Sequence, residues 1–411
     1  MAKVLVVGAG GREHAIAYKF NQEGHEVYMA GINPAVEKFG ICIDIKEDDI
    51  PSYALENSID LVFVGPEVPL VNGLVDKLQE KGIRAFGPSK KAAQLEGSKV
   101  FSKMMMEKYN IPTAKHESFS DYEKASEYLS QQKAPIVLKA DGLAAGKGVI
   151  IAETLEEAQH ELKEMMCNSK FAAAGANVVI EEFLSGEEFS LMCFVSDRKV
   201  YPMEIAQDHK RAFDNDEGLN TGGMGAYCPL KKITQDDVNE GLEKVVQPMV
   251  DAMSSEGMSF YGILYAGLMK CADGVKTIEF NVRFGDPESE VLLLKLESSL
   301  YEISNNIIDG KDVVLKWNKD AFIGVVMAAK GYPEKSEKGA VINGLEKLTT
   351  PVFHMGTKQV DGNIVINGGR VLLVCASGEN LQAAREKVYN EIGKIGCDDL
   401  FFRKDIGHHS L

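Results

Sequence analysis

The sequence predicts a multidomain protein of mixed α/β and α+β architecture, with a parallel-sheet (Rossmann-like) domain at the N-terminus and a small strand-rich domain at the C-terminus. The length of 411 residues corresponds to about two to four domains. Short apolar runs alternate with helical patterns over residues 1–100, which is the rhythm of a parallel sheet covered by helices. An apolar strand pattern restarts near Phe322.

In the N-terminal region we expect strands at 4–7, 26–30, 60–64 and 84–86 and helices at 12–22 and 73–81. A single helix is predicted at 90–109, where Ile111 and Pro112 end it. Its apolar face would carry Val100, Phe101, Met104 and Met105. Lys99 and Lys103 would lie on neighbouring turns of this helix, because they are four residues apart.

A small α+β lid is predicted next. It would have strands at 136–140 and 149–152 with a glycine loop between them, followed by a helix after Thr154. Strand-like runs at 178–181 and 189–195 come after this helix, where the lid would join a larger body. Thr154 and Glu157 form a capping-box pattern, and Leu155, Ala158, Leu162 and Met165 follow helical spacing. Further along we expect a glycine-rich loop at 220–227, a strand hairpin at 262–269 and 276–284, and a helix at 381–392.

The composition excludes several classes of protein. A hydrophobic content of 45% excludes a disordered chain. A net charge of −16 argues against nucleic acid and anionic membranes as partners. The seven cysteines are scattered and lack metal-site spacing. The chain starts as a strand and turn instead of a signal peptide, and its apolar runs are too short to cross a bilayer, so we expect a cytoplasmic protein.

The turn at residues 8–14 contains Gly8, Gly10 and Gly11 between a strand and a helix. Such a turn presents backbone N–H groups to an anion. Position 13 is Glu, so the third glycine of a dinucleotide fingerprint is missing. A phosphate or small-ligand cradle, a packing turn and an NAD site all stay open.

The loop at 142–148 differs from a P-loop, because Gly142 and Gly146 are too close and Lys147 is followed by Gly148. A glycine hairpin of this kind suits a lid that closes over phosphates, with Lys139 pointing into the same cleft. A plain surface turn is the alternative.

Residues 276–284 carry the strongest local signal. In a strand, Glu279, Asn281 and Arg283 project to one face, and Ile278, Phe280, Val282 and Phe284 project to the core. A carboxylate and an amide oxygen suit Mg²⁺, and the guanidinium could neutralise a transferring phosphoryl group. The alternative is a solvated face with a weak Glu–Arg pair.

Two charged stretches are weaker signals. Residues 181–184 end a strand whose exposed backbone could bind an adenine edge, and Glu187 or Glu188 could accept from ribose hydroxyls. Asp208 to Arg211 is a mixed-charge loop, and each stretch would more often be plain surface.

The order of these motifs resembles that of the ATP-grasp ligases, and within them the sequence is similar to the phosphoribosylamine-glycine ligase family. The similarity extends essentially end to end. It rests on Gly-Gly-Arg-Glu-His at 10–14, Val-Gly-Pro-Glu-Val-Pro-Leu at 64–70, the loop at 139–148, Gln-Asp-His-Lys-Arg at 207–211, Asn-Thr-Gly-Gly-Met-Gly-Ala-Tyr at 220–227, Arg-Phe-Gly-Asp-Pro-Glu at 283–288, Asn-Gly-Gly-Arg at 367–370 and Phe-Arg-Lys-Asp-Ile-Gly at 402–407.

The resemblance implies an ATP-grasp fold in four parts: an N-terminal substrate domain (1–100), a lid subdomain with its linking helix (101–187), a catalytic subdomain (188–321) and a C-terminal domain (322–411). It implies ATP-dependent ligation of glycine to 5-phosphoribosylamine through glycyl phosphate, giving glycinamide ribonucleotide, ADP and phosphate in de novo purine biosynthesis. The resemblance also allows one protein partner, the enzyme that supplies phosphoribosylamine, in a transient contact.

The resemblance also implies residue roles. ATP would be bound by Lys99, Lys139, Gly146, Lys147, Gly148, Glu181, Glu182, Phe183, Leu184 and Glu188. Glu279 and Asn281 would hold Mg²⁺ or Mn²⁺, and ATP oxygens and water would complete the shell, because residues 265–270 contain no acid. Arg283, Lys139 and Asp286 would be catalytic. Substrate would be bound by Gly10, Gly11, Pro66, Glu67, Asp208, Lys210, Gly222, Gly223 and Arg283.

Other functions remain as alternatives. The nearest is another ATP-grasp carboxylate-amine ligase or a biotin-dependent carboxylase subunit. A non-catalytic ATP-binding module and an NAD oxidoreductase come from different classes.

Overall fold

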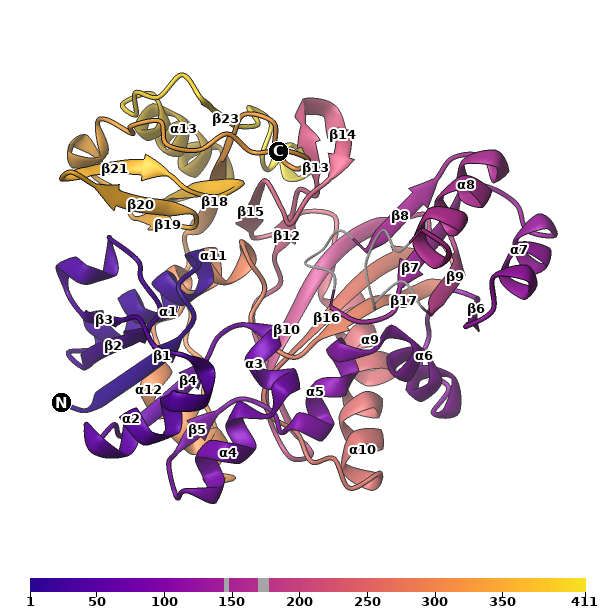
Figure 1. Cartoon of the computed structure of the whole chain (residues 1–411), viewed down its shortest axis with the longest axis horizontal. Helices are drawn as coiled ribbons and strands as arrows, with labels where there is room; N and C mark the ends of the chain where they lie inside the picture. Colours follow the sequence, from indigo (N-terminus) through magenta and orange to yellow (C-terminus); the bar gives the residue numbers. More distant parts are fainter. Residues whose placement is uncertain (144–147, 169–176) are drawn as a thin grey trace.

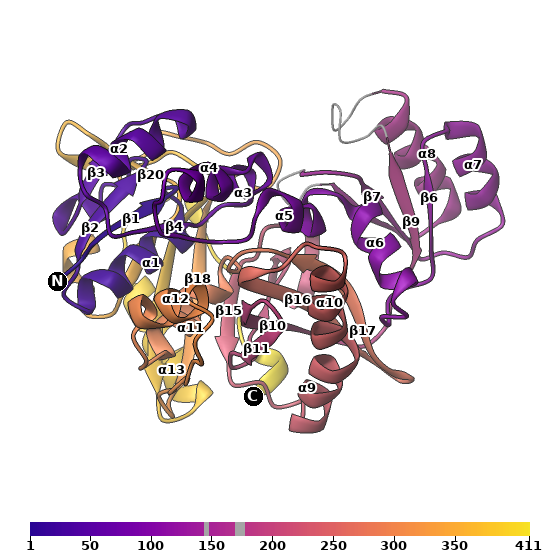
Figure 2. The same ribbon diagram turned by 90° about the horizontal axis from the view of Figure 1, so that it is seen from below.

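The computed structural model describes residues 1–143, 148–168 and 177–411. The N-terminal and C-terminal sheets lie together at one end of the molecule, a central antiparallel sheet lies in the middle, and a small unit projects at the other end (Figures 1 and 2). Among the described residues, no helix combines the length and apolar character needed to cross a bilayer.

The N-terminal sheet is parallel, in the order β3-β2-β1-β4-β5. Alternate residues of β1 (Lys3–Val7) serve two faces: Val4 and Val6 pack in the cluster that includes α1 (Gly11–Gln22), whereas Leu5 and Val7 pack with the opposite helices. The remaining elements are β2 (Glu26–Ala30), η1 (Val36–Lys38), β3 (Ile41–Ile43), η2 (Glu47–Asp49), α2 (Ile50–Glu56), β4 (Leu61–Val64), α3 (Glu67–Asn72), α4 (Leu74–Glu80) and β5 (Ala85–Phe86).

The predicted helix at 90–109 is wrong in one respect, because it is two helices, α5 (Lys90–Gly97) and α6 (Lys99–Lys108). Ser98 has extended backbone angles, and its Oγ accepts from Phe101 N at 3.1 Å, so it ends one helix and caps the next. The break changes the buried face. Met104 is 50% exposed, whereas Ser102, Lys103, Met105 and Met106 are buried.

The projecting unit has the expected lid composition. Its antiparallel sheet has the order β6-β9-β7-β8. Two helices cover the sheet and share a separate apolar core with it, which includes Leu138, Leu162 and Ile180. The elements are β6 (His116–Phe119), α7 (Tyr122–Ser130), β7 (Ile136–Ala140), β8 (Val149–Ala152), α8 (Leu155–Met166) and β9 (Val178–Glu182).

The central sheet has the order β11-β10-β16-β17. The strand predicted at 276–284 ends early, at Asn281, because the next backbone N–H, that of Val282, donates to Glu96 Oε2 at 2.8 Å. A bulge opposite Gly267 and Leu268 changes the alternation, so Ile278 lines the cleft beside Glu279 instead of entering the core as predicted. The elements are β10 (Glu187–Ser196), β11 (Lys199–Pro202), α9 (Gln235–Gly241), η5 (Leu242–Val246), α10 (Gln247–Ser255), β16 (Tyr261–Cys271) and β17 (Gly274–Asn281).

The C-terminal sheet follows the order β12-β15-β18-β22-β19, with β23 also paired to β18. Its first two strands come from residues 207–228, far upstream of β18. The elements are β12 (Gln207–Asp208), β13 (Arg211–Phe213), η4 (Asp214–Asp216), β14 (Glu217–Asn220), β15 (Gly225–Cys228), β18 (Ala321–Ala329), η6 (Leu345–Lys347), β19 (Val352–His354), β20 (Thr357–Val360), β21 (Asn363–Ile366), β22 (Arg370–Gly378), α13 (Leu381–Ile392), β23 (Leu400–Phe401) and η7 (His408–Ser410).

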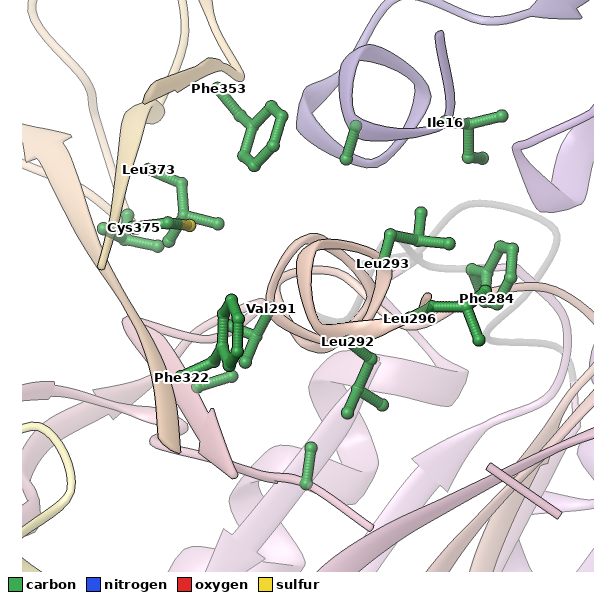
Figure 3. Close-up of a cluster of buried hydrophobic side chains, with 14 of the residues drawn as sticks. Ile16, Phe284, Val291, Leu292, Leu293, Leu296, Phe322, Phe353, Leu373 and Cys375 are labelled. Atoms are coloured by element: carbon green, nitrogen blue, oxygen red, sulfur yellow. The ribbon is translucent and has the colours of Figure 1, made fainter. Parts of the chain in front are cut away.

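Helix α11 (Glu288–Lys295) joins these parts, and α12 (Leu300–Ile308) follows it. Apolar side chains project from α11 in several directions, among them Val291, Leu292 and Leu293 (Figure 3). Ile16 of α1 lies on one side of this helix, and Leu373 of β22 lies on another. A helix that is apolar around most of its circumference is typical of a buried position. α11 therefore fixes the N-terminal domain against the C-terminal sheet.

Candidate active site

The candidate site is a cleft between the lid unit, the central sheet and the N-terminal domain. It consists of a smaller space of about 130 Å³ and a larger one of about 670 Å³. Both spaces are lined by Glu67, Lys139, Glu181, Glu279 and Arg283, among others, so they adjoin.

Three lysines gather at the lid side of the cleft. Lys103 on α6 and Lys139 on β7 both contact the buried Glu181 carboxylate, at 3.1 and 3.0 Å. Lys139 Nζ also donates to Ile278 O at 2.9 Å, and Lys99 Nζ donates to Gly142 O at 3.0 Å. Burial lowers the pKa of Lys99 and lowers that of Lys103 to about 8. The Glu181 side chain thus orients two lysines.

Glu279 and Asn281 lie at the end of β17 and line the same space as these lysines. Burial alone would raise the pKa of Glu279, but the charges of Lys210, Lys139 and Lys99 lower it below its usual value. An ionised carboxylate beside an amide oxygen fits a hard divalent cation. The neighbouring strand places Gly267 opposite Glu279, so it offers no second acid at that position.

Arg283 is held by several acceptors just past β17. Its Nη2 lies 2.8 Å from Glu96 Oε1 and donates to Asn281 Oδ1 at 3.0 Å, and its Nε lies 3.6 Å from Glu67 Oε2. Burial raises the pKa of Glu96 even though Arg283 opposes this. The guanidinium therefore lies in a fixed position beside the Glu279–Asn281 pair.

The larger space contains a second polar group. Lys210 Nζ donates to Asp208 Oδ2 at 2.9 Å and lies 3.4 Å from Glu188 Oε1. Close by, Tyr265 OH donates to the buried Glu288 Oε1 at 2.5 Å. Burial raises the pKa of Asp208, and the charge of Glu188 adds to this although Lys210 opposes it. Burial, followed by the charge of Asp208, raises the pKa of Glu288.

Asp286 and Arg370 close the far end of the cleft. Arg370 Nη1 lies 3.0 Å from Asp286 Oδ1 and donates to the carbonyl oxygens of Asp286 and Gly222, at 2.9 and 2.8 Å. Gly223 has a φ of +112°. A Cβ at this position would lie only 2.6 Å from Cδ of Pro287, so the glycine leaves room for the proline ring. The glycine-rich loop is therefore packed against the segment that carries Asp286.

The Gly10–Gly11 turn is occupied by the chain itself. Gly10 N donates to Glu13 Oε2 at 2.9 Å. A Cβ on Gly65 would meet Glu13 Oε1 at 2.5 Å, so the same side chain fills the space between the turn and the end of β4. The expected anion cradle already contains a carboxylate.

The structure brings most of the predicted site residues to the cleft: Lys99, Lys139, Gly148, Glu181, Glu182, Phe183, Leu184, Glu188, Glu67, Asp208, Lys210, Gly222, Glu279, Asn281, Arg283 and Asp286. Four predicted residues are not among those lining it: Gly10, Gly11, Pro66 and Gly223. Gly146 and Lys147 lie outside the described residues.

The cleft also contains residues to which the sequence led us to assign no role, namely Lys103, Glu96, Arg12, Arg370, Tyr265 and Glu288. Spacing from Lys99 pointed to Lys103, and the motifs at 10–14, 283–288 and 367–370 contain Arg12, Glu288 and Arg370. Glu96 and Tyr265 had no local signal, because tertiary contacts alone bring them to the site.

Family models match almost the whole chain. They are described as the N domain, the ATP-grasp (A) domain and the C domain of phosphoribosylglycinamide synthetase, and they cover residues 2–96, 97–289 and 322–409.

Relatives match over nearly their full length. The phosphoribosylamine-glycine ligase of Halalkalibacterium halodurans is 51% identical over 99% of this chain and 97% of its own. The enzyme of that name from Lactococcus lactis is 46% identical over 100% of both chains.

Solved structures agree. The crystal structure of phosphoribosylamine-glycine ligase from Thermotoga maritima has a TM-score of 0.87 at 32% identity and covers 98% of this chain and 99% of its own. The biotin carboxylase domain of Hydrogenobacter thermophilus 2-oxoglutarate carboxylase has a TM-score of 0.75 at 17% identity, covering 98% of this chain and 91% of its own, which shows a shared fold. On these grounds the chain belongs to the phosphoribosylamine-glycine ligase family and has the ATP-grasp fold.

Proposed function

We propose that this cleft catalyses ATP-dependent ligation of glycine to 5-phosphoribosylamine, giving glycinamide ribonucleotide, ADP and phosphate. One observation carries the proposal: the two lysines that contact Glu181 line a single space together with Glu279, Asn281 and Arg283. Cations on both sides of an oxygen-donor pair are what phosphoryl transfer requires.

ATP would lie along the lid side. Lys99, Lys103 and Lys139 would contact its phosphates, with Gly148 at the edge of the smaller space. The adenine would meet the segment of Glu181, Glu182, Phe183 and Leu184, and Glu188 would accept from the ribose hydroxyls. Glu187 is less suited, because it already accepts from Gln207 Nε2 at 3.0 Å and contacts Lys232 at 3.1 Å.

Glu279 and Asn281 would hold Mg²⁺ or Mn²⁺. When bound, the metal would offset charge on the ATP phosphates. The name of the H. thermophilus structure includes MgADP, which supports Mg²⁺ as the first ion to test.

The chemistry needs no protein nucleophile. A glycine carboxylate oxygen would attack the γ-phosphorus of ATP, ADP would leave, and glycyl phosphate would form. The amine nitrogen of phosphoribosylamine would then attack the acyl carbon, lose a proton and expel phosphate. Arg283 and Lys139 would stabilise the charge on the transferring group, and the lid unit would keep water from the acyl phosphate.

The acceptor would bind in the larger space. Asp208, Lys210 and Gly222 line it, and Arg370 holds Asp286 at its far end. We assign Asp286 to the acceptor end of the reaction and Glu67 to orienting Arg283. Gly10, Gly11, Pro66 and Gly223 would act through the backbone that supports this space.

Four further points belong to the proposal. The chain would divide into four parts, residues 1–100, 101–187, 188–321 and 322–411.

Transient contact with the enzyme that supplies phosphoribosylamine would deliver the acceptor. If Gly10 takes part in binding, the Glu13 side chain would move away from the turn. The free cysteines support a reducing compartment, and therefore a cytoplasmic location.

The test is a coupled assay of ADP release with ATP and Mg²⁺, together with mass detection of glycinamide ribonucleotide. ADP release should require glycine and phosphoribosylamine together. Turnover with another amine in place of phosphoribosylamine, or with bicarbonate in place of glycine, would overturn the assignment.

A further inference from the structure

A second cluster of potential metal ligands lies at the rim of the larger space. The potential ligand atoms of His209, His408 and His409 lie within 4.8 Å of one another. Each of these histidines also lies close to the Asp216 carboxylate of η4. The C-terminus lies beside the β13–β14 hairpin that contains Asp216 (Figure 1). His209, Asp216 and His409 all line the cleft, so the cluster is accessible from it.

The two oxygens of Asp216 have different surroundings. Oδ1 lies 2.9 Å from Nη1 of the fully buried Arg403 and 3.6 Å from His209 Nδ1. Oδ2 lies 3.1 Å from His409 Nε2 and 3.8 Å from His408 Nε2. Two supporting groups therefore hold the carboxylate through one oxygen, and the other oxygen faces two imidazoles.

His209 belongs to the supporting groups. Its Nε2 accepts from Gly407 N at 2.9 Å, so the neutral ring carries its proton on Nδ1, toward Asp216. The ring is buried and held from both sides, by Gly407 and by Asp216, so it supports the carboxylate.

His408 has the support typical of a metal-bound histidine. Its Nδ1 lies 2.9 Å from Asp405 O, which can accept the ring proton and leave the Nε2 lone pair free. Arg403 binds Asp405 as well, with Nε–Oδ1 at 2.8 Å. Hydrogen bonds of this kind, made by the nitrogen that does not bind metal, orient ligands in metal sites.

We propose that His408 Nε2, His409 Nε2 and Asp216 Oδ2 form a binding site for a Zn²⁺-class transition-metal ion, with water on its open side toward the cleft. Four donors about 2.0–2.1 Å from Zn²⁺ lie roughly 3.3 Å apart. The separations of 3.1 and 3.8 Å from Asp216 Oδ2 need only small side-chain rotations to reach this geometry.

The donor chemistry separates this site from the one at Glu279 and Asn281. Imidazole favours Zn²⁺, Co²⁺ and Ni²⁺, whereas carboxylate and amide oxygens favour Mg²⁺. A metal here would link the last residues of the chain to the hairpin after His209, next to Asp208 and Lys210. Its role is structural: it anchors the C-terminal segment at the rim of the cleft.

Co²⁺ binding followed by visible absorption tests the proposal, with chelator-treated full-length protein in excess Mg²⁺ so that the Glu279 site is occupied. The wild-type chain should show one saturable equivalent with d–d bands and a higher melting temperature with Zn²⁺. His409→Ala and His408→Ala should each weaken Co²⁺ binding at least ~10-fold and lose the Zn²⁺-dependent increase in melting temperature.

Two controls make the result specific. His160→Ala removes an exposed histidine on α8 and should retain the spectrum. Glu279→Gln should retain it as well, because the proposed ligands are elsewhere. A wild-type chain without the bands, or His408→Ala and His409→Ala variants that titrate like the wild type, would overturn the proposal.

Discussion

The two ends of the cleft use different cations. The lysine end contains Lys99, Lys103 and Lys139, and two of these share the Glu181 carboxylate. The arginine end contains Arg12, Arg283 and Arg370, which contact carboxylates that include Glu13, Glu96 and Asp286. A lysine is a compact charge whose pKa shifts readily on burial, whereas an arginine stays charged and holds a fixed planar geometry.

This difference separates two tasks within one reaction. In the proposed reaction, phosphates would enter and leave at the lysine end, where adaptable point charges can follow them. At the arginine end, fixed guanidinium groups would keep the acceptor side rigid while the acyl group is transferred. Glu279 and Asn281 line both spaces of the cleft, where the two ends meet.

Glu279→Gln should have the largest effect, because it would remove the carboxylate charge that we propose binds the metal where both ends of the cleft meet. We expect turnover to fall ~1000-fold, or about 4 kcal/mol of transition-state stabilisation. Steady-state ADP release across a Mg²⁺ titration measures this, with circular dichroism as the control for folding. Wild-type turnover at limiting Mg²⁺ would contradict the role of Glu279.

Glu181→Gln tests the lysine end through stability. Lys103 and Lys139 would remain buried without their shared counter-charge, and we expect a loss of about 3 kcal/mol in the free energy of unfolding. Denaturant unfolding measures it. Glu117→Gln, at an exposed position on the adjacent strand β6, is the matched control and should change little. Equal stability of the two variants would mean that Glu181 does not hold the lysines.

Arg283→Lys tests the arginine end while preserving the charge. Lysine cannot reproduce the contacts with Glu96, Asn281 and Glu67 together, so we expect kcat/KM for glycine to fall ~30-fold, or about 2 kcal/mol. If fixed geometry is unimportant at this end, Arg283→Lys will retain wild-type kinetics.

The pH dependence should also differ between the ends. Burial lowers the pKa of Lys103 to about 8, so this lysine carries a charge that would attract phosphate below pH 8 and loses that charge above it. We expect kcat/KM for ATP to fall by up to ~10-fold per pH unit above 8. Lys103→Met should have lower activity and lack this alkaline decrease. A decrease that persists in Lys103→Met would have to come from another group.

The smallest effect should come from an ion pair of the same type outside the cleft. Lys199 and Asp312 are 2.7 Å apart, with side chains 52% and 82% exposed. Lys199→Ala should leave turnover and the unfolding midpoint unchanged within error, because solvent screens such pairs. A measurable loss would weaken the view that burial gives the cleft lysines their importance.

The elements predicted correctly from the sequence are those with strong local patterns. β2 and α13 have the predicted bounds, and α8 begins after its Thr154 cap. The prediction of a single helix at 90–109 was wrong, because the break at Ser98 depends on a capping hydrogen bond that hydrophobic periodicity does not reveal.

The candidate site shows the same limit. Glu279 and Asn281 could be predicted because strand alternation aims both at one face, but Ile278 was placed wrongly because a bulge resets the alternation. Arg370 is 148 residues from Gly222 and 84 residues from Asp286. Glu96 is also far from Arg283 along the chain, and only the tertiary fold joins these partners. Local patterns identify the donors, and long-range packing supplies the groups that orient them.

The position of α11 has a consequence for synthesis on the ribosome. α1 leaves the exit tunnel early. Helix α11, which packs against the buried face of α1 near Ile16, is made roughly 270 residues later. Contacts so distant in sequence form late, because the intervening loop must close first. The nascent N-terminal segment should therefore expose apolar surface until α11 emerges, and chains truncated before Glu288 should be good substrates for holding chaperones.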